Sequence, residues 1–163
     1  MAQARRKKSP GDAPGGIEML LADHQTVDGL FREFKKRHEA EKDTNKVIDA
    51  TRIALLIHDA IEMKIFYPAI RALADEDVEE ILDEAEVEHT SLQQLLAQLR
   101  PGKLEDKKRE AHFTVLMEYV RHHVKEEENE LFPKVRKLKR YNDAKVGARM
   151  AVRRLSLGKK LMK

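Results

Sequence analysis

Two histidine–glutamate pairs constrain this chain more than any other feature. His58 is followed four residues later by Glu62, and His123 is followed at the same spacing by Glu127. On an α-helix, four residues advance the chain by about 400°, so each imidazole lies beside its carboxylate on one face. An imidazole and a carboxylate placed side by side suit two ligands of one metal centre. Both pairs also run into an aromatic residue followed by proline, and the recurrence of the whole pattern indicates a shared role.

The composition favours a single helical domain. The chain has 163 residues, of which 41% are hydrophobic and 37% charged, and this length is enough to bury a full core. It contains no cysteine, which excludes disulfides and thiolate metal sites and is consistent with a reducing cytoplasm. No apolar run approaches the roughly 20 residues of a membrane span, and the basic N-terminus lacks the apolar segment of a signal peptide. We therefore expect a cytoplasmic protein with no membrane partner.

The net charge of +3 is unevenly distributed. Four consecutive cations occupy Arg5 to Lys8, many more follow Lys134, and residues 75–88 are acidic. Basic ends can contact nucleic acid, but they serve more often as solubilising arms, which is the interpretation we favour. Residues 1–16 combine Ser, Pro, Gly and charge without apolar periodicity, and we interpret them as a disordered basic arm.

Apolar residues at three- and four-residue spacing predict four long helices and one shorter helix. The long helices begin near Ile17, Asn45, Asp75 and Leu104, and the short amphipathic one spans about Asp143 to Arg154 and carries Val146, Met150 and Val152. Pro68 is expected to kink or end the second helix. The connections are short and no strand pattern occurs, so we predict an all-α, antiparallel, up-down-up-down four-helix bundle over residues 17–140. Residues 141–163 would form the C-terminal helix and a basic tail.

Each of the four long helices has a histidine on its apolar stripe. These residues are His24, His58, His89 and His123. With a rise of about 1.5 Å per residue, the distances to the predicted helix ends bring the four imidazoles into one layer, within a turn or two. Two carboxylates buried together in that layer would be costly without a cation. The sequence therefore predicts a metal site inside the bundle.

The order of these motifs resembles the hemerythrin-like, or HHE cation-binding, family over roughly residues 17–140. The segments that carry the likeness are LLADHQTVDGLFREF, HDAIEMKIFYPAI, EHTSLQQLLAQL and HHVKEEENELFPKV. The resemblance implies a bundle that holds two iron ions, bridged by an oxo or hydroxo group, and that binds O2 or a related small oxidant such as peroxide or nitric oxide. It implies one histidine pair for each iron and two bridging carboxylates: His24 with His58, His89 with His123, and Glu62 with Glu127. Manganese and zinc accept the same ligand types and stay open.

One position departs from the oxygen-carrying members of that family, which have a second histidine one turn after the ligand of the third helix. This chain has Gln93 there, on the same face as His89 and within reach of the same ion by helical spacing. A neutral amide donates less charge than imidazole, so we expect irreversible oxidation in air instead of a long-lived O2 adduct. Oxidant or iron sensing, peroxide or nitric oxide chemistry, and plain iron binding stay open. Whether turnover occurs is also open.

Several further residues have two readings. Tyr119, one turn before His123, is interpreted either as a hydrogen-bond donor to bound oxygen species or as core. Glu126 is an alternative bridge to Glu127, since a spacing of three residues also reaches. His38 is expected on the surface, and His122 is expected on a helix surface or at an interface between helices.

Two other functions compete with the hemerythrin-like one. A ferritin-like di-iron carboxylate protein would use two Glu-x-x-His motifs. Glu86 and His89 provide one, but Tyr119 occupies the glutamate position before His122, so the second is missing. A metal-free helical interaction module would suit the basic ends and would leave the buried histidine and glutamate layer unexplained.

Overall fold

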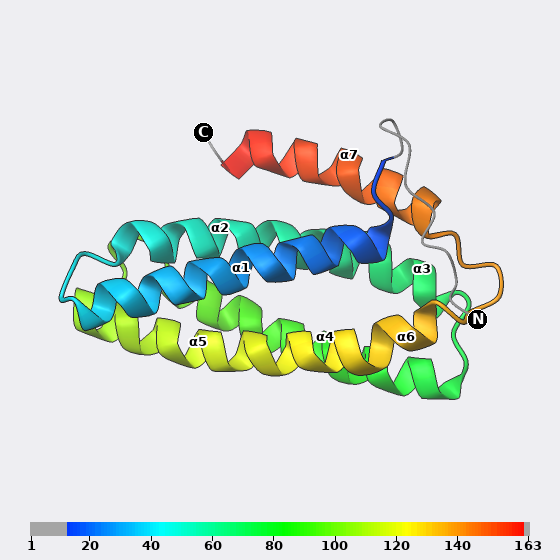
Figure 1. The fold of residues 1–163 in the computed structure, drawn as a ribbon, viewed down its shortest axis with the longest axis horizontal. Coiled ribbons are helices and arrows are strands. Elements are labelled where there is room, and N and C mark those ends of the chain that lie inside the picture. The colour runs from blue at the N-terminus through cyan, green and yellow to red at the C-terminus, as the bar shows by residue number, and fades with distance from the viewer. Residues whose placement is uncertain (1–12, 162–163) are drawn as a thin grey trace, which may run out of the picture.

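Four long helices lie side by side and alternate in direction in the computed structural model, which describes residues 13–161 (Figure 1). They are α1 (Gly16–Glu39), α2 (Asn45–Ile61), α4 (Glu76–Gln98) and α5 (Asp106–Glu126). No residue in the described range forms a strand. The predicted all-α bundle is confirmed. None of the described helices is both long enough and apolar enough to cross a bilayer.

A π-helical turn begins at the glutamate of each His-x-x-x-Glu pair. These turns are η1 (Glu62–Phe66) and η2 (Glu127–Leu131), and they lead into α3 (Tyr67–Arg71) and α6 (Phe132–Val135). In η1 the N–H of Tyr67 donates to the carbonyl of Glu62, five residues earlier. A proline has no N–H and crowds the carbonyl four residues before it, and the wider π turn removes that conflict. The helix therefore passes through Pro68 and does not end there.

The hydrophobic core has two parts, one on each side of the histidine layer. One part packs Leu20, Ile61 and Phe66 with the start of α7 (Asp143–Leu161). The other part, towards the far end of the bundle, includes Phe31 and Phe113, whose ring centroids lie 5.8 Å apart. The polar layer is therefore closed off by apolar side chains from both ends of the bundle.

The apolar stripes of α1 and α2 are buried, whereas α4, α5 and α7 each turn outward one residue that helical spacing could place inward. In α4 the spacing allows either Leu92 or Gln93 on the inner face, and the structure buries Leu92 and exposes Gln93. In α5 the side chain of Tyr119 is 45% exposed because Val120, on the other side of the stripe, faces the interior. Val152 of the last helix is also exposed. In each case the helix is turned so that a neighbouring aliphatic residue faces inward. The periodicity of the sequence does not fix this rotation of the helix about its axis.

Helix α7 packs against α1 and α2 and extends past Arg154, its predicted end (Figure 1). Its first residue, Asp143, accepts a hydrogen bond from the N–H of Ile17 at 2.9 Å. The disordered arm predicted for residues 1–16 falls mostly outside the described residues. Its last residue, Gly16, is buried and begins α1. The docking of α7 therefore orders the start of the first helix.

Gly147 is required where α7 crosses the segment before α1. A Cβ at this position would lie 2.7 Å from the carbonyl carbon of Gly15, which is closer than real contacts allow. We expect Gly147→Ala to lower the free energy of unfolding by about 1–3 kcal/mol through overpacking. Gly29→Ala is the matched control, because nothing lies within 4 Å of its Cβ, and alanine there should raise stability by about 1 kcal/mol. Urea unfolding followed by circular dichroism measures both, and equal effects would contradict the docked position of α7.

Candidate metal centre

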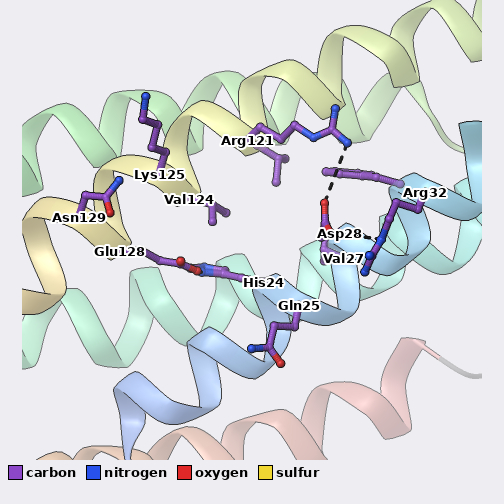
Figure 2. Close-up of a pocket in the computed structure, with 12 residues that line it drawn as sticks. His24, Gln25, Val27, Asp28, Arg32, Arg121, Val124, Lys125, Glu128 and Asn129 are labelled. Carbon is purple, nitrogen blue, oxygen red and sulfur yellow. Dashed lines mark hydrogen bonds and ion pairs between the residues drawn. The ribbon is translucent and has the colours of Figure 1, made fainter.

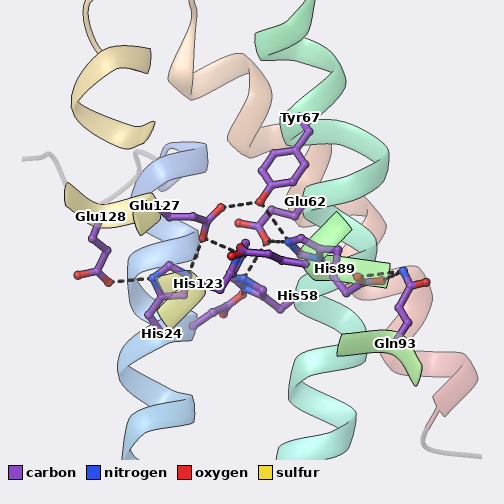
Figure 3. A network of polar contacts seen from close by, with 12 residues as sticks. His24, His58, Glu62, Tyr67, His89, Gln93, His123, Glu127 and Glu128 are labelled. Carbon is purple, nitrogen blue, oxygen red and sulfur yellow. Dashed lines mark hydrogen bonds and ion pairs between the residues drawn. The ribbon is translucent and has the colours of Figure 1, made fainter. Parts of the chain in front are cut away.

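Six side chains from all four long helices and their π turns converge in the middle of the bundle (Figure 3). They are the six ligands that the resemblance implies: His24, His58, Glu62, His89, His123 and Glu127, all of them buried. Glu62 is 0% exposed and Glu127 is 2% exposed, so neither carboxylate has access to bulk water. The layer predicted from helical rise is therefore present in the structure.

Each glutamate lies between one histidine of each proposed pair. Glu62 Oε2 lies 3.0 Å from Nε2 of His58 and 3.2 Å from Nε2 of His89. Glu127 Oε2 lies 3.3 Å from Nε2 of His24 and 3.5 Å from Nε2 of His123. Potential ligand atoms within 4.8 Å of one another form two fully buried sets that share Glu62: His24, His58, Glu62 and Glu127, and Glu62, His89 and His123. A third set, Glu88, His122 and Glu126, includes the exposed His122 and lies outside the buried centre.

The centre contains buried polar atoms that the protein itself leaves unsatisfied. Both carboxylate oxygens of Glu62, Oε2 of Glu127 and Nε2 of His24 and His123 have no well-formed hydrogen bond among the described residues. The short Nε2–Oε2 separations therefore bring these atoms together without the geometry of good hydrogen bonds. An unsatisfied buried carboxylate costs several kcal/mol, on the order expected for an unpaired buried charge. A nitrogen and oxygen donor set of this kind fits first-row metal ions.

An outer ring of four carboxylates holds the four imidazoles by their Nδ1 atoms. The pairs and their Nδ1–oxygen distances are Asp23 with His58 (3.1 Å), Asp59 with His89 (2.8 Å), Glu88 with His123 (2.7 Å) and Glu128 with His24 (2.8 Å). With Nδ1–H donated outward, each Nε2 presents its lone pair to the interior. This second layer of partners fixes ring orientation and raises the basicity of metal-binding histidines.

The sequence analysis missed this outer ring, although a signal for it exists. An acidic residue stands directly beside a proposed ligand in all four long helical segments: Asp23 before His24, Asp59 after His58, Glu88 before His89, and Glu128 after Glu127. Adjacent residues on a helix point about 100° apart, so the acid beside one ligand faces the neighbouring helix. Each acid therefore supports a histidine of a different helix, which only the packing of the helices reveals.

The two halves of the centre are related by an internal repeat, with one difference. His24 and His89, His58 and His123, and Glu62 and Glu127 are all separated by the same number of residues. Tyr67 and Phe132 correspond in the same way. The hydroxyl of Tyr67 donates to Oε1 of Glu127 at 2.7 Å and lies 3.1 Å from Nε2 of His89. Phe132 instead stacks on the ring of His24, with centroids 6.0 Å apart. The His89 side therefore has a phenol, and the His24 side has an apolar ring.

The electrostatics of the centre favour positive charge at the imidazoles. Burial by itself lowers the pKa of His89, but the hydrogen bond that the ring donates to Asp59 and the nearby negative charges of Glu62 and Glu127 outweigh it and raise the pKa to about 9. The pKa values of His58 and His123 are raised for the same reason, by the neighbouring glutamates and the outer carboxylates, against the effect of burial. Without metal, protons on these rings compensate the buried carboxylates, and a bound cation would replace them.

Tyr67, and not Tyr119, is the phenol of this centre. Burial, followed by the charges of Glu127 and Glu62, raises the pKa of Tyr67 well above its usual value, so it stays a hydrogen-bond donor. The hydroxyl of Tyr119 has no hydrogen bond among residues 13–161, although its side chain borders a small cavity beside His89 and His123. In the sequence Tyr67 is only the aromatic residue that precedes Pro68, and this pattern does not indicate a role at the site.

Gln93 lies outside the cluster of ligands, contrary to the position expected from helical spacing (Figure 3). Its amide nitrogen donates to both oxygens of Asp59, at 3.0 and 2.9 Å. Gln93 therefore acts on His89 through Asp59 and does not stand as a ligand beside it.

The remaining side-chain candidates have surface partners. Glu126 lies 3.1 Å from the exposed His122 and does not join the buried set, so it is no alternative bridge in this conformation. His38 pairs with Glu110 at the surface, as expected.

A groove on the outside of the bundle leads to the centre between α1 and α5 (Figure 2). It has a volume of about 380 Å³. Its inner wall shares His24, Val27, Val120 and Val124 with a small cavity that reaches all four histidines. The remaining walls of that cavity are aliphatic, from Leu55 and Leu92. A few side chains therefore separate the surface from a largely apolar cavity next to the imidazoles.

The fold and this site define a class: a four-helix bundle protein with a buried histidine and carboxylate centre for metal ions. A model of the hemerythrin HHE cation-binding domain matches residues 15–135, and the chain belongs to that family. The match ends before α7. Searches of curated proteins and of solved structures found no match. The family implies cation binding of a di-iron type, and the six converging residues fit such a site.

The raised imidazole pKa values predict how the metal-free protein responds to pH. A pKa raised on folding stabilises the folded state fully below the unfolded value, near 6.5, and that stabilisation is lost as pH rises through the folded value. For His89 the window is therefore pH 6.5 to about 9, and the loss is on the order of 3 kcal/mol. Urea unfolding of chelator-treated protein across this range measures it. His112→Ala is the control: this half-buried ring contacts the backbone carbonyl of Lys108 and joins no set of ligand atoms, so its loss should leave the pH dependence unchanged. Stability of the native protein that stays constant or rises with pH would contradict the assignment.

Proposed function

We propose that this protein is a non-haem di-iron protein that binds and reacts with a small oxidant, namely O2, peroxide or nitric oxide. The observation that carries this proposal is the placement of two buried carboxylates, each between histidines of opposite pairs, with three of their four oxygens left without a hydrogen bond. A bridging carboxylate must reach both ions, and these positions allow it. Sensing and detoxification of oxidants are the roles that such a site would serve.

We assign His24 and His58 to one ion and His89 and His123 to the other, with Glu62 and Glu127 as bridges. The two clusters of ligand atoms support this division, since each contains one histidine pair. The outer carboxylates keep every Nε2 directed inward. Iron held there would supply one-electron chemistry and open positions for a small oxidant. Zinc or manganese would satisfy the same donors, so the identity of the metal is part of the proposal.

The protein side chains around the centre control protons and water. Tyr67 holds a proton on its hydroxyl, 2.7 Å from Glu127, where it can donate to an anionic oxygen without exposure to solvent. The aliphatic walls of the inner cavity keep bulk water away from the histidines, and a dry site strengthens every electrostatic interaction inside it. The difference between Tyr67 and Phe132 makes the two sides unequal, so we place the oxidant on the side of His89.

Reversible O2 carriage is not part of this proposal. The family's oxygen carriers have a further histidine where this chain has Gln93, and here Gln93 is turned towards Asp59. No third imidazole joins His89 and His123 among the described residues. The His89 side is therefore left with fewer strong donors, which favours irreversible oxidation over a stable adduct.

The structure does not support the ferritin-like alternative, because the glutamate of its one Glu-x-x-His motif has a different partner. Glu86, which would supply a ligand from Glu86-x-x-His89, instead accepts a hydrogen bond from Arg71 at 2.8 Å. The metal-free helical module remains as the outcome that would overturn the proposal.

Metal analysis and a visible spectrum of protein purified aerobically without chelators test the proposed function. We expect about two irons per chain and the near-ultraviolet bands of an oxo-bridged centre. Protein that binds no metal, even after anaerobic addition of ferrous ion, would support the helical module. Stoichiometric zinc without iron would retain the site and reject the oxidant chemistry.

The same assay applied to Glu62→Ala and Glu127→Ala tests the bridges. Each variant should lose both irons or retain one, because a bridge compensates the charge of both ions. His38→Ala, whose surface pair with Glu110 is remote from the ligands, should retain full iron. A harmful Glu126→Ala beside a harmless Glu127→Ala would show that the fourth helix is out of register by one residue.

Access to the centre should depend on Val124, which lines both the groove and the inner cavity. We expect Val124→Phe to slow the oxidation of ferrous protein by O2 several-fold, because a phenyl ring is larger than the valine side chain and would fill the space between groove and cavity. The measurement is stopped-flow absorbance after mixing with O2. Val115→Phe is the matched control, since Val115 is 45% exposed on the same helix and borders neither space. Equal rates in the native protein and both variants would exclude this route.

A further inference from the structure

Helix α7 contacts the outer ring of the metal centre through one side chain. Arg154 donates from Nη1 to Oδ1 of Asp23 at 2.8 Å and from Nη2 to Oδ2 at 2.6 Å. Oδ2 of the same aspartate lies 3.1 Å from Nδ1 of His58. A continuous chain of contacts therefore runs from the C-terminal helix to a proposed ligand. The family match covers residues 15–135, so α7 lies outside the matched region.

The position of Arg154 follows from the way α7 is anchored. Asp143 accepts from the N–H of Ile17, Gly147 packs against the backbone just before α1, and Met150 is fully buried. These three contacts are spaced at three or four residues and fix one face of α7 against α1. Arg154 follows Met150 by four residues on the same face, and this brings its guanidinium to Asp23. The contact is therefore specified by the helix register and not by a chance encounter of surface side chains.

The four carboxylates of the outer ring differ in the partners that they have besides their histidine. Asp59 receives only the neutral amide of Gln93, and Glu88 lies 3.6 Å from the exposed His122. Asp23 has both oxygens bound by a guanidinium, in the bidentate geometry that gives the strongest charge-assisted hydrogen bonds. Its side chain is 17% exposed and that of Arg154 is 35% exposed. Within residues 13–161, no other member of the ring has a bidentate cationic partner.

We propose that Arg154 is a positioning residue for the His58 side of the centre. By binding both oxygens of Asp23 it holds the carboxylate in the one orientation that accepts the Nδ1–H of His58, so α7 becomes part of the metal site. This inference rests on the proposed function, in which His58 is a metal ligand. The contact predicts that the ion bound by His58 depends on α7, whereas the ion bound by His89 does not.

Two physical effects of Arg154 oppose each other, and a lysine variant separates them. The fork of the guanidinium orients Asp23 and favours binding by His58, whereas its positive charge repels a bound cation. Arg154→Ala removes both effects, and Arg154→Lys removes the fork but retains the charge. If orientation dominates, both variants release metal faster. If charge dominates, Arg154→Ala releases metal more slowly and Arg154→Lys behaves like the native protein.

The experiment is anaerobic release of ferrous ion from the full-length loaded protein into an excess of a coloured ferrous chelator. We expect two phases in the native protein, one for each ion. In Arg154→Ala and Arg154→Lys, one phase should accelerate about tenfold, as is usual when an outer partner of a histidine ligand is lost, and the other should change less than about twofold. Arg153→Ala is the matched control, because the neighbouring arginine has no hydrogen bond to the outer ring. Unchanged release in both variants, or equal acceleration of both phases, would overturn the proposal.

A double-mutant cycle distinguishes positioning from general loosening of α7. If Arg154 acts through Asp23, then Arg154→Lys should have no further effect on release in an Asp23→Asn background. An undiminished effect in that background would show that Arg154 supports the fold and not the ligand.

The metal-free protein provides a readout that does not depend on iron. Nitrogen NMR of the imidazoles should show a changed His58 signal in Arg154→Lys and an unchanged His89 signal. A native protein that binds no iron would reject the proposed function, and this signal would still decide the role of Arg154. Binding of two irons with identical His58 signals and identical release in all variants would reject the role of Arg154 alone.

Discussion

The burial of Glu62 and Glu127 in the middle of the bundle is the constraint on which the rest of the structure depends. Two carboxylates without access to water are tolerated only beside compensating positive charge. His58, His89 and His123 provide it when protonated, and metal ions would provide it in their place. The apolar core is divided into two parts around this layer. The polar centre therefore interrupts the hydrophobic packing along the bundle.

The outer ring of carboxylates shows how a helical bundle can position ligands by its own packing. Each acid beside one ligand accepts from the histidine of another helix, as the pair of Asp59 and His89 illustrates. Movement of one helix would therefore disturb the ligand of the next one. The π turns at Glu62 and Glu127 belong to the same arrangement, because they carry the helix through the following proline and so keep the ligand pairs on unbroken helices.

The sequence was sufficient for the fold class and for the positions of the six proposed ligands. Helical periodicity locates His58 and Glu62 on one face, and the order of the four motifs identifies the family. The sequence did not correctly predict the directions of Tyr119 and Gln93, which were both expected to face the metal. A stripe three or four residues wide allows several rotations of the helix, and the competition between Tyr119 and Val120 for the interior is decided by the neighbouring helices.

What the sequence determined by itself is the set of helices and most of the residues on their inner faces, because these depend on local spacing and on short connections. What only the tertiary structure decided is which side chains act on one another across helices. Tyr67 reaches Glu127 across the bundle, and Arg154 reaches Asp23 from the far end of the chain. Contacts between residues distant in sequence depend on the relative rotation and height of packed helices, and no local pattern encodes these quantities.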